Sequence, residues 1–142
     1  MSVDVKYRTE GTATGGGRNG SATLASGMLS VVMATPTALG GSGKGHNPEE
    51  LFALGYAACF LGAMRFAAAS EKLGTVPEAA TVTASVGIGP RSDGGFGLTV
   101  DLTVALPGVD RDVAQKIVDR GHFICPYSNA TKGNIAVTTT LV

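Results

Sequence analysis

Two cysteines, Cys59 and Cys125, are the residues of this chain with the clearest capacity for chemistry. Cys59 lies inside LFALGYAACFLGAM (51–64), a run without a charged residue that is typical of a buried helix. A thiol in such a helix is in most proteins an inert, small hydrophobic side chain. Burial also raises the pKa of a thiol, which disfavours the reactive thiolate. A reactive Cys59 therefore requires a cation close to its sulfur.

Arg18 is the cation best placed to serve a buried thiol. It lies in the segment GTATGGGRNG (11–20), where we expect a loop because three consecutive glycines leave the backbone unusually free. Such a loop can fold over a pocket and deliver a guanidinium to it. The alternative is a solvated loop arginine, and sequence position alone does not separate the two interpretations.

Cys125 directly precedes Pro126, and a residue before proline is disfavoured in the helical region. We therefore expect residues 125–134 to be irregular and Cys125 to be mobile. A rigid thiol on a helix and a mobile thiol on a loop suit a pair in which a sulfenic acid on the first is captured as a disulfide by the second.

Two other chemistries remain open for the same thiols. A zinc site would require His46 and His122 to converge with both cysteines. An acyl-transfer pair would use a cysteine with His122 as its base. His122 is more often a solvated residue near a helix C-terminus, where its charge complements the helix dipole.

Length and composition bound the classes of function. A chain of 142 residues suits a single domain over 1–142. Eleven basic residues balance eleven acidic ones, so nothing indicates a nucleic acid or an anionic membrane as partner. The charged fraction of 15% is low, which suggests that part of the surface is covered, most simply by a second copy of the chain.

The hydrophobic segments of the sequence indicate where in the cell the protein is expected. The N-terminal MSVDVKYRTE has no apolar run of the kind found in signal peptides, so we expect a cytoplasmic protein. The apolar run before Arg65 is short and weakly hydrophobic, which fits a core helix better than a membrane span. The cytosol is reducing, so a structural disulfide is not expected.

The elements that position these residues can be read from periodicity. Alternating residues and turn signals predict strands at 2–9, at two short pieces within 21–33, at 82–90 and 96–106 around a hairpin turn, and at 134–142. A long Gly/Pro loop over 35–48 precedes a helix that begins at Pro48, with Asn47 as its N-cap, and ends near Leu73. A second, amphipathic helix is expected over 109–122, ending near Gly121. This pattern predicts an α+β fold with antiparallel sheets.

Two sequence runs together resemble the paired signature of a known family. NPEELFALGYAACF (47–60) and CPYSNATKGNIAV (125–137) are similar to the signature of the organic hydroperoxide resistance (Ohr) family within the Ohr/OsmC superfamily. TATGGGRNG (12–20) resembles that family's arginine-bearing loop, and LGGSGKGHNPE (39–49) resembles the loop that follows it. The likeness spans essentially the whole chain.

The resemblance implies a fold, an activity and a set of roles. The fold would be OsmC-like, with antiparallel sheets wrapped around central helices in an intertwined homodimer. The activity would be a thiol-dependent peroxidase that reduces organic hydroperoxides to alcohols, with Cys59 peroxidatic, Cys125 resolving, and Arg18 and Glu49 assisting. No cofactor would be bound. The reductant would be a lipoyl dithiol, either dihydrolipoamide or a lipoylated protein.

Glu49 takes the carboxylate role because it directly follows the proline of the family's NPE motif. This chain carries a second acid, Glu50, where the family commonly has Gln. Ten residues of helix separate Glu49 from Cys59 by about 15 Å along the axis, too far for a carboxylate to reach. We therefore predict a composite site, with Cys59 and Cys125 from one subunit and Glu49 with Arg18 from the other, although the flexible loop of Arg18 could reach either site.

The competing function is a non-catalytic protein of the same fold that binds a hydrophobic ligand or senses redox state. A sensor needs an output surface, such as a basic face for DNA, and this neutral chain shows none. A binder or sensor would react with hydroperoxide stoichiometrically at most, whereas a peroxidase turns over.

Overall fold

The structure, a computed structural model, describes all residues 1–142. The chain divides into two compact units, Met1–Pro48 and Glu49–Val142, and each is described here by itself. The expectation of a single domain over 1–142 stays a prediction.

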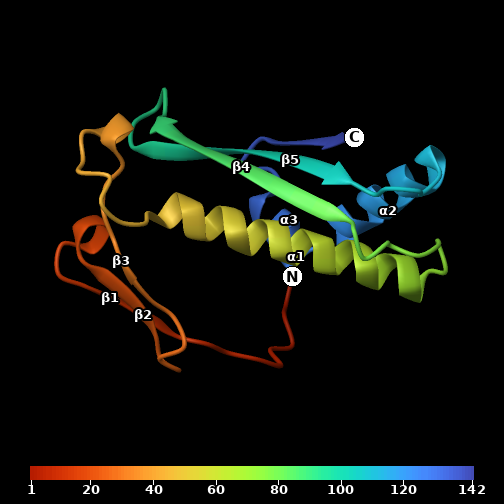
Figure 1. The fold of residues 1–142 in the computed structure, drawn as a ribbon, viewed down its shortest axis with the longest axis horizontal. Coiled ribbons are helices and arrows are strands. Elements are labelled where there is room, and N and C mark those ends of the chain that lie inside the picture. Colours follow the sequence, from red (N-terminus) through yellow and green to blue (C-terminus); the bar gives the residue numbers. More distant parts are fainter. The chain divides into compact units, whose positions relative to one another are not determined.

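The N-terminal unit contains an antiparallel sheet in the order β1-β2-β3 (Figure 1). Its strands are β1 (Gly11–Thr14), β2 (Ser21–Leu24) and β3 (Ser30–Val32), so the two short strands expected within 21–33 are confirmed. Two single 3-10 turns, η1 (Gly17–Asn19) and η2 (Thr37–Leu39), lie in the glycine-rich segments. Positive φ angles at Gly15 and Gly17 allow the chain to turn sharply between β1 and η1.

Two expectations for this unit were wrong. Residues 2–9 form no strand, and the side chains of Val3, Val5 and Tyr7 are exposed. A strand needs a neighbour for its backbone N–H and C=O groups, and no strand of this chain pairs with the segment. The segment GTAT (11–14), expected as loop, is instead a strand, because it pairs in register with β2 from Gly11 opposite Leu24 to Thr14 opposite Ser21.

The C-terminal unit contains a second sheet in the order β4-β5-β6, formed by β4 (Thr81–Pro90), β5 (Phe96–Ala105) and β6 (Val137–Leu141). The β4-β5 hairpin is confirmed with the expected turn, and Pro90 pairs with Phe96 at its end. β6 pairs parallel with β5, so the expectation of purely antiparallel sheets was wrong. The parallel pairing is possible because two helices carry the chain back between these strands.

One face of this sheet is packed and the other is open. Along β5 the side chains of Val100, Leu102 and Val104 are buried, whereas the residues between them are exposed. The helices α1 (Pro48–Ser70) and α2 (Arg111–Ile124) supply the other half of the core. Figure 1 shows α1 running along the β4-β5 hairpin.

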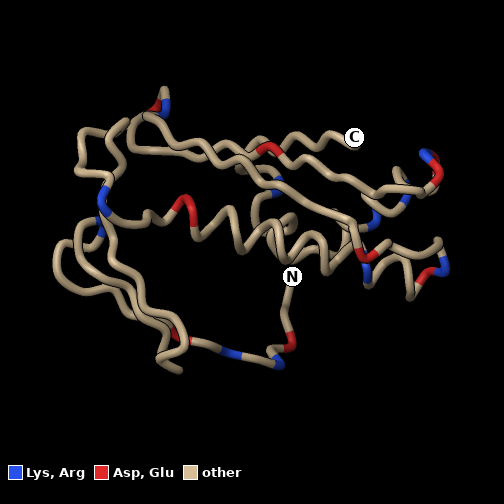
Figure 2. The backbone as a smooth tube through the Cα atoms, viewed as in Figure 1, with Lys and Arg blue, Asp and Glu red and all other residues tan.

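The apolar run of the sequence forms the middle of α1, which is a core helix. Its side chains Tyr56, Phe60 and Met64 are fully buried. Its charged residues lie near its ends, and none occurs from Leu51 to Met64 (Figure 2). The helix is long and apolar enough to cross a membrane by length and composition alone, but the burial of these large side chains identifies it as part of the core.

Two expectations about the following helices were also wrong. α2 begins at Arg111, two residues after the expected start, and the Asp110 carboxylate caps it by accepting hydrogen bonds from the backbone N–H groups of Asp112 and Val113. It does not end at Gly121, which is buried inside the helix because a side chain there would meet Met64. The segment expected to be irregular contains a short helix, α3 (Pro126–Thr131), with proline at its first position.

Candidate active site

The structure brings the two thiols together. Cys59 lies in the middle of α1, and Cys125 lies at the junction of α2 and α3. The two sulfur atoms are 3.6 Å apart, and both thiols are free. Cys125 has extended backbone angles (φ −63°, ψ 120°), as the following proline demands, and this turns the chain from one helix into the next.

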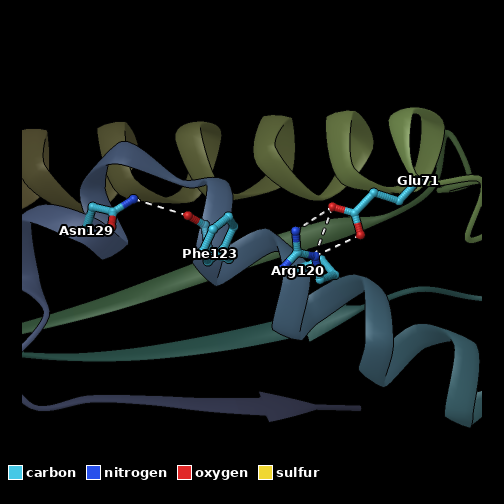
Figure 3. Close-up of polar contacts among 4 residues, drawn as sticks. All are labelled: Glu71, Arg120, Phe123 and Asn129. Carbon is cyan, nitrogen blue, oxygen red and sulfur yellow. Dashed lines mark hydrogen bonds and ion pairs between the residues drawn. The ribbon is translucent and has the colours of Figure 1, made fainter. Parts of the chain in front are cut away.

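Cys125 lies between two helices and not in the irregular segment that was expected, and its mobility stays a prediction. Its side chain is fully buried. Its backbone N–H donates to the carbonyl of Gly121 at 2.8 Å, and its carbonyl accepts from the backbone N–H of Asn129 at 3.0 Å. The Asn129 side-chain Nδ2 also donates to the carbonyls of Phe123 (3.2 Å) and Cys125 (3.3 Å), the first of which is drawn in Figure 3.

An ion pair fastens the end of α2 to the residue that follows α1. The guanidinium of Arg120 donates to both oxygens of the Glu71 carboxylate at 2.6–2.9 Å, and it lies 4.4 Å from the ring centroid of Phe123 (Figure 3). These hydrogen bonds lower the pKa of Glu71. The pair is open to solvent, so it orients the helix end more than it stabilises the fold.

Opposing effects act on the pKa of the Cys59 thiol. Burial raises it most, a backbone hydrogen bond from Tyr127 lowers it, and the hydrogen bond and charge of the neighbouring Cys125 raise it further. The donor must be the Tyr127 N–H group, the one backbone group that can donate to a sulfur and favour the thiolate. Burial is the larger effect, so the pKa of Cys59 is raised, and a cation close to the sulfur would favour the thiolate.

Aromatic packing seats α3 against α1 beside the thiols. The ring of Tyr127 stacks on that of Phe52 and tilts against that of Tyr56, with centroids 5.9 and 5.7 Å away. Gly55 makes room for this ring, since a Cβ atom there would lie 3.0 Å from the Tyr127 hydroxyl. The small residue at position 55 therefore serves packing within the chain.

His122 is turned away from acid–base or metal chemistry at the thiols. Its Nδ1 lies 3.0 Å from Ser128 Oγ and its Nε2 lies 2.8 Å from Thr139 Oγ1, so both ring nitrogens have hydroxyl partners. Burial lowers its pKa, against an opposing effect of Asp119. No three metal-ligating side chains gather in the structure, and neither the zinc site nor the acyl-transfer pair gains support.

The other two expected site residues, Glu49 and Arg18, lie in parts of the chain that carry neither thiol. Glu49 lies in the first turn of α1, ten residues before Cys59, and is half-buried, whereas Glu50 is exposed. Arg18 belongs to the 3-10 turn η1 of the N-terminal unit. The participation of Arg18 and Glu49 in the site stays a prediction.

Sequence reasoning missed three residues that lie around the thiol pair. Tyr127 contributes through its backbone, which no side-chain pattern reveals. Tyr56 and Ser128 contribute a buried hydrogen bond of 3.0 Å between α1 and α3. Their positions in the sequence could have identified them, because Tyr56 is three residues before Cys59 and Ser128 is three residues after Cys125.

Comparisons with known proteins agree on a single family. A family model described as OsmC-like protein matches residues 41–140. An organic hydroperoxide resistance protein from Xanthomonas axonopodis pv. citri is 51% identical over 138 residues, which cover 96% of this chain and 95% of that relative. The organic hydroperoxide resistance protein OhrB from Bacillus subtilis is 41% identical over 123 residues, covering 86% of this chain and 88% of its own.

Solved structures show the same relationship in three dimensions. An organic hydroperoxide resistance protein from Elizabethkingia anophelis matches with a TM-score of 0.90 and 44% identity over 98% of each chain. The crystal structure of OhrB from Bacillus subtilis matches with a TM-score of 0.85 and 38% identity, covering 97% of this chain and all of that one. These matches confirm the α+β, OsmC-like fold with two small sheets and central helices. The chain therefore belongs to the organic hydroperoxide resistance family of OsmC-like proteins.

Proposed function

We propose that this protein is a peroxidase that reduces organic hydroperoxides to alcohols with its own two thiols. The Cys59 thiolate attacks the terminal oxygen of the hydroperoxide, the O–O bond breaks, and the alkoxide takes a proton and leaves as an alcohol. Cys59 is then a sulfenic acid. The Cys125 sulfur attacks it, a disulfide forms and water leaves. An external dithiol restores both thiols through a mixed disulfide.

The pair of free thiols 3.6 Å apart is the observation that carries this proposal. A disulfide requires sulfur atoms about 2.05 Å apart, so the two atoms must approach by roughly 1.5 Å. Side-chain rotation supplies a movement of this size, and the helices need not separate. A sulfenic acid on Cys59 thus has its resolving thiol beside it before further oxidation occurs.

The apolar surroundings of Cys59 favour substrates with hydrocarbon groups. Cys59 is partly buried and packs against the main hydrophobic core of the C-terminal unit. Each buried methylene contributes about 0.8 kcal/mol, so two or three of them favour an alkyl or fatty-acyl hydroperoxide over hydrogen peroxide by roughly tenfold to a hundredfold.

Arg18 and Glu49 would complete the site from a second copy of the chain. The raised pKa of Cys59 calls for a cation, and Arg18 is the candidate, with Glu49 orienting its guanidinium. Glu49 lies about 15 Å along α1 from the Cys59 of its own chain, so it suits the site of another subunit better.

A homodimer is supported by apolar surface that the chain leaves uncovered. α1 exposes a stripe formed by Leu54, Ala58, Gly62 and Phe66, in which Leu54 is 70% and Phe66 63% exposed. The N-terminal segment exposes Val3, Val5 and Tyr7 as well. An apolar helix face of this kind is typical of an interface, and a second copy would cover it.

A lipoyl dithiol, supplied as dihydrolipoamide or on a lipoylated protein, is the proposed reductant. No bound cofactor enters the scheme. We also propose that the protein works in the cytoplasm, where such dithiols are kept reduced, without a nucleic acid or membrane partner.

Steady-state turnover of cumene hydroperoxide with dihydrolipoamide tests the function. We expect continuous consumption of hydroperoxide, much weaker turnover with glutathione or thioredoxin, and no turnover by Cys59→Ser. A hydroxyl is a far poorer nucleophile than a thiolate at neutral pH, which is why this variant should be inactive. Consumption that stops after one equivalent would instead identify a ligand binder or a redox sensor.

A further inference from the structure

A hydrogen-bonded network of four hydroxyl side chains and one imidazole runs through the interior next to the thiol pair. It links Thr139 of β6, His122 of α2, Ser128 and Thr131 of α3, and Tyr56 of α1. Tyr56, Ser128 and Thr131 are buried, and no buried side-chain polar atom in the structure lacks a partner. α1, α2, α3 and β6 are thus tied together by one hydrogen-bonded network.

The direction of every hydrogen bond in this network follows from counting protons. Thr131 donates its hydroxyl proton to the backbone carbonyls of Tyr127 (3.0 Å) and Ser128 (3.2 Å), so its oxygen must accept from Tyr56 at 3.2 Å. The proton of Tyr56 is then used, and its oxygen accepts from Ser128 at 3.0 Å.

The same count fixes the tautomer of His122. With the Ser128 proton used, the Ser128 oxygen accepts from His122 Nδ1–H at 3.0 Å. Nε2 is then the acceptor of the neutral ring, and it receives the proton of Thr139 at 2.8 Å. The pKa of His122, lowered by burial, agrees with a neutral ring. Within the network Tyr56, Ser128 and His122 each donate one proton and accept one, so the removal of one hydroxyl leaves a neighbouring donor or acceptor without its partner.

This network joins the same two helices that carry the thiols, at adjacent positions. Tyr56 precedes Cys59 by three residues, so both side chains lie near the same face of α1. Ser128 follows Cys125 by three residues across the first turn of α3. The Tyr56–Ser128 hydrogen bond therefore runs beside the Cys59–Cys125 contact and sets the distance between the two backbones that carry the sulfur atoms.

We propose that Tyr56 and Ser128, oriented by His122, are positioning residues that hold α3 against α1 so that Cys125 stays within reach of Cys59. The proposal rests on the proposed function in one respect, namely that the disulfide of this pair is a step of the peroxidase reaction. No hydrogen bond joins these hydroxyls to either sulfur, and we assign their effect to the placement of α3.

A thiol–disulfide equilibrium measures this placement without any peroxide. In glutathione buffers, two protein thiols and one oxidised glutathione give the protein disulfide and two reduced glutathione molecules, so the equilibrium constant reports how well the thiols are held together. Tyr56→Phe keeps the aromatic packing and removes one hydroxyl, and Ser128→Ala removes its partner. We expect each to lower the constant by about tenfold, the effect of one buried hydrogen bond.

A control variant and a double variant distinguish a positioning role from a general loss of protein stability. Thr140→Val removes an exposed hydroxyl from the neighbouring position of β6 and should leave the constant unchanged. The double variant Tyr56→Phe/Ser128→Ala should lose no more than either single variant, because both interrupt the same chain. Unchanged constants in folded Tyr56→Phe, or losses that multiply fully in the double variant, would overturn the proposal.

A second readout follows the fate of the sulfenic acid. After one equivalent of cumene hydroperoxide without reductant, mass spectrometry should find more sulfinic acid on Cys59 and less disulfide in Tyr56→Phe than in the Thr140→Val control. If wild-type protein does not react with the hydroperoxide while the glutathione constants change as expected, the proposed function fails and the positioning role stands. An unchanged partition between disulfide and sulfinic acid in a reactive Tyr56→Phe protein would contradict the role in catalysis.

Discussion

Subunit complementation tests whether each site is built from two chains. The relevant length is that of α1, which runs without interruption from Pro48 to Ser70 and contains both Glu49 and Cys59. Ten residues at about 1.5 Å each separate them by about 15 Å along the axis, and by roughly 80° around it. A glutamate side chain spans only a few ångströms, so we expect Glu49 to serve the thiol of another subunit more easily than that of its own chain.

The perturbation is a pair of variants that are inactive by themselves. Cys59→Ser removes the nucleophile, and Glu49→Ala removes the carboxylate that would orient Arg18. In a heterodimer of the two, one site receives Cys59 from the second chain and Glu49 from the first, and it is intact. Equal mixing with free exchange makes about half of the dimers mixed, each with one working site of two, so we expect about a quarter of wild-type activity.

The assay is turnover of cumene hydroperoxide with dihydrolipoamide before and after subunit exchange, with heterodimers quantified by differently tagged chains. Arg18→Ala should behave as Glu49→Ala does. Glu50→Ala is the matched control, because Glu50 is the adjacent carboxylate and is exposed, so this variant should be active without mixing. Persistent inactivity in confirmed heterodimers would refute the composite site and show that each site is formed within one chain.

Three further outcomes are expected. Cys125→Ser should consume one equivalent of hydroperoxide and stop with Cys59 as a sulfenic acid, which a dimedone adduct detects; if it fails to react even once, Cys125 does more than resolve. Gly121→Ala should lower the free energy of unfolding in urea, because its Cβ would lie 2.7 Å from Met64 Cγ. The overpacking costs about 1–3 kcal/mol, which exceeds the roughly 1 kcal/mol that alanine gains over glycine in a helix. A more stable variant would show that Met64 moves freely. The free energy of unfolding should also fall as the pH falls below about 6.5, because the unfolded state protonates His122 there while burial lowers its pKa in the folded state. His122→Asn should reduce this slope in urea denaturation at about pH 7.5 and 5.5, and an unchanged slope would place its origin elsewhere.

Local sequence signals predicted the elements that depend on local chemistry. The β4-β5 hairpin followed from period-two alternation around RSDGG, and the start of α1 followed from Pro48 and the acidic residues after it. The end of α2 was misplaced because Gly121 is a typical helix terminator, and only its packing against Met64 and Phe60 explains why the helix continues.

Features that depend on distant partners could not be predicted from the sequence. α3 is six residues long, too short to be stable alone, and it is held by the hydrogen bond from Ser128 to Tyr56 and by the packing of Tyr127. β1 has no hydrophobic alternation and exists because it pairs with β2. For the site, the resemblance identified the two cysteines, whereas the Tyr127 backbone donor to Cys59 required coordinates.

The most direct test of the central claim is a single turnover without reductant. Reduced protein is mixed with one equivalent of cumene hydroperoxide, the alcohol is quantified, and the cysteines are mapped by peptide mass spectrometry. The account predicts one equivalent of alcohol and an intrachain disulfide between Cys59 and Cys125, the two sulfurs that lie 3.6 Å apart. Alcohol formation with both thiols still free, or intact hydroperoxide beside fully reduced protein, would contradict it.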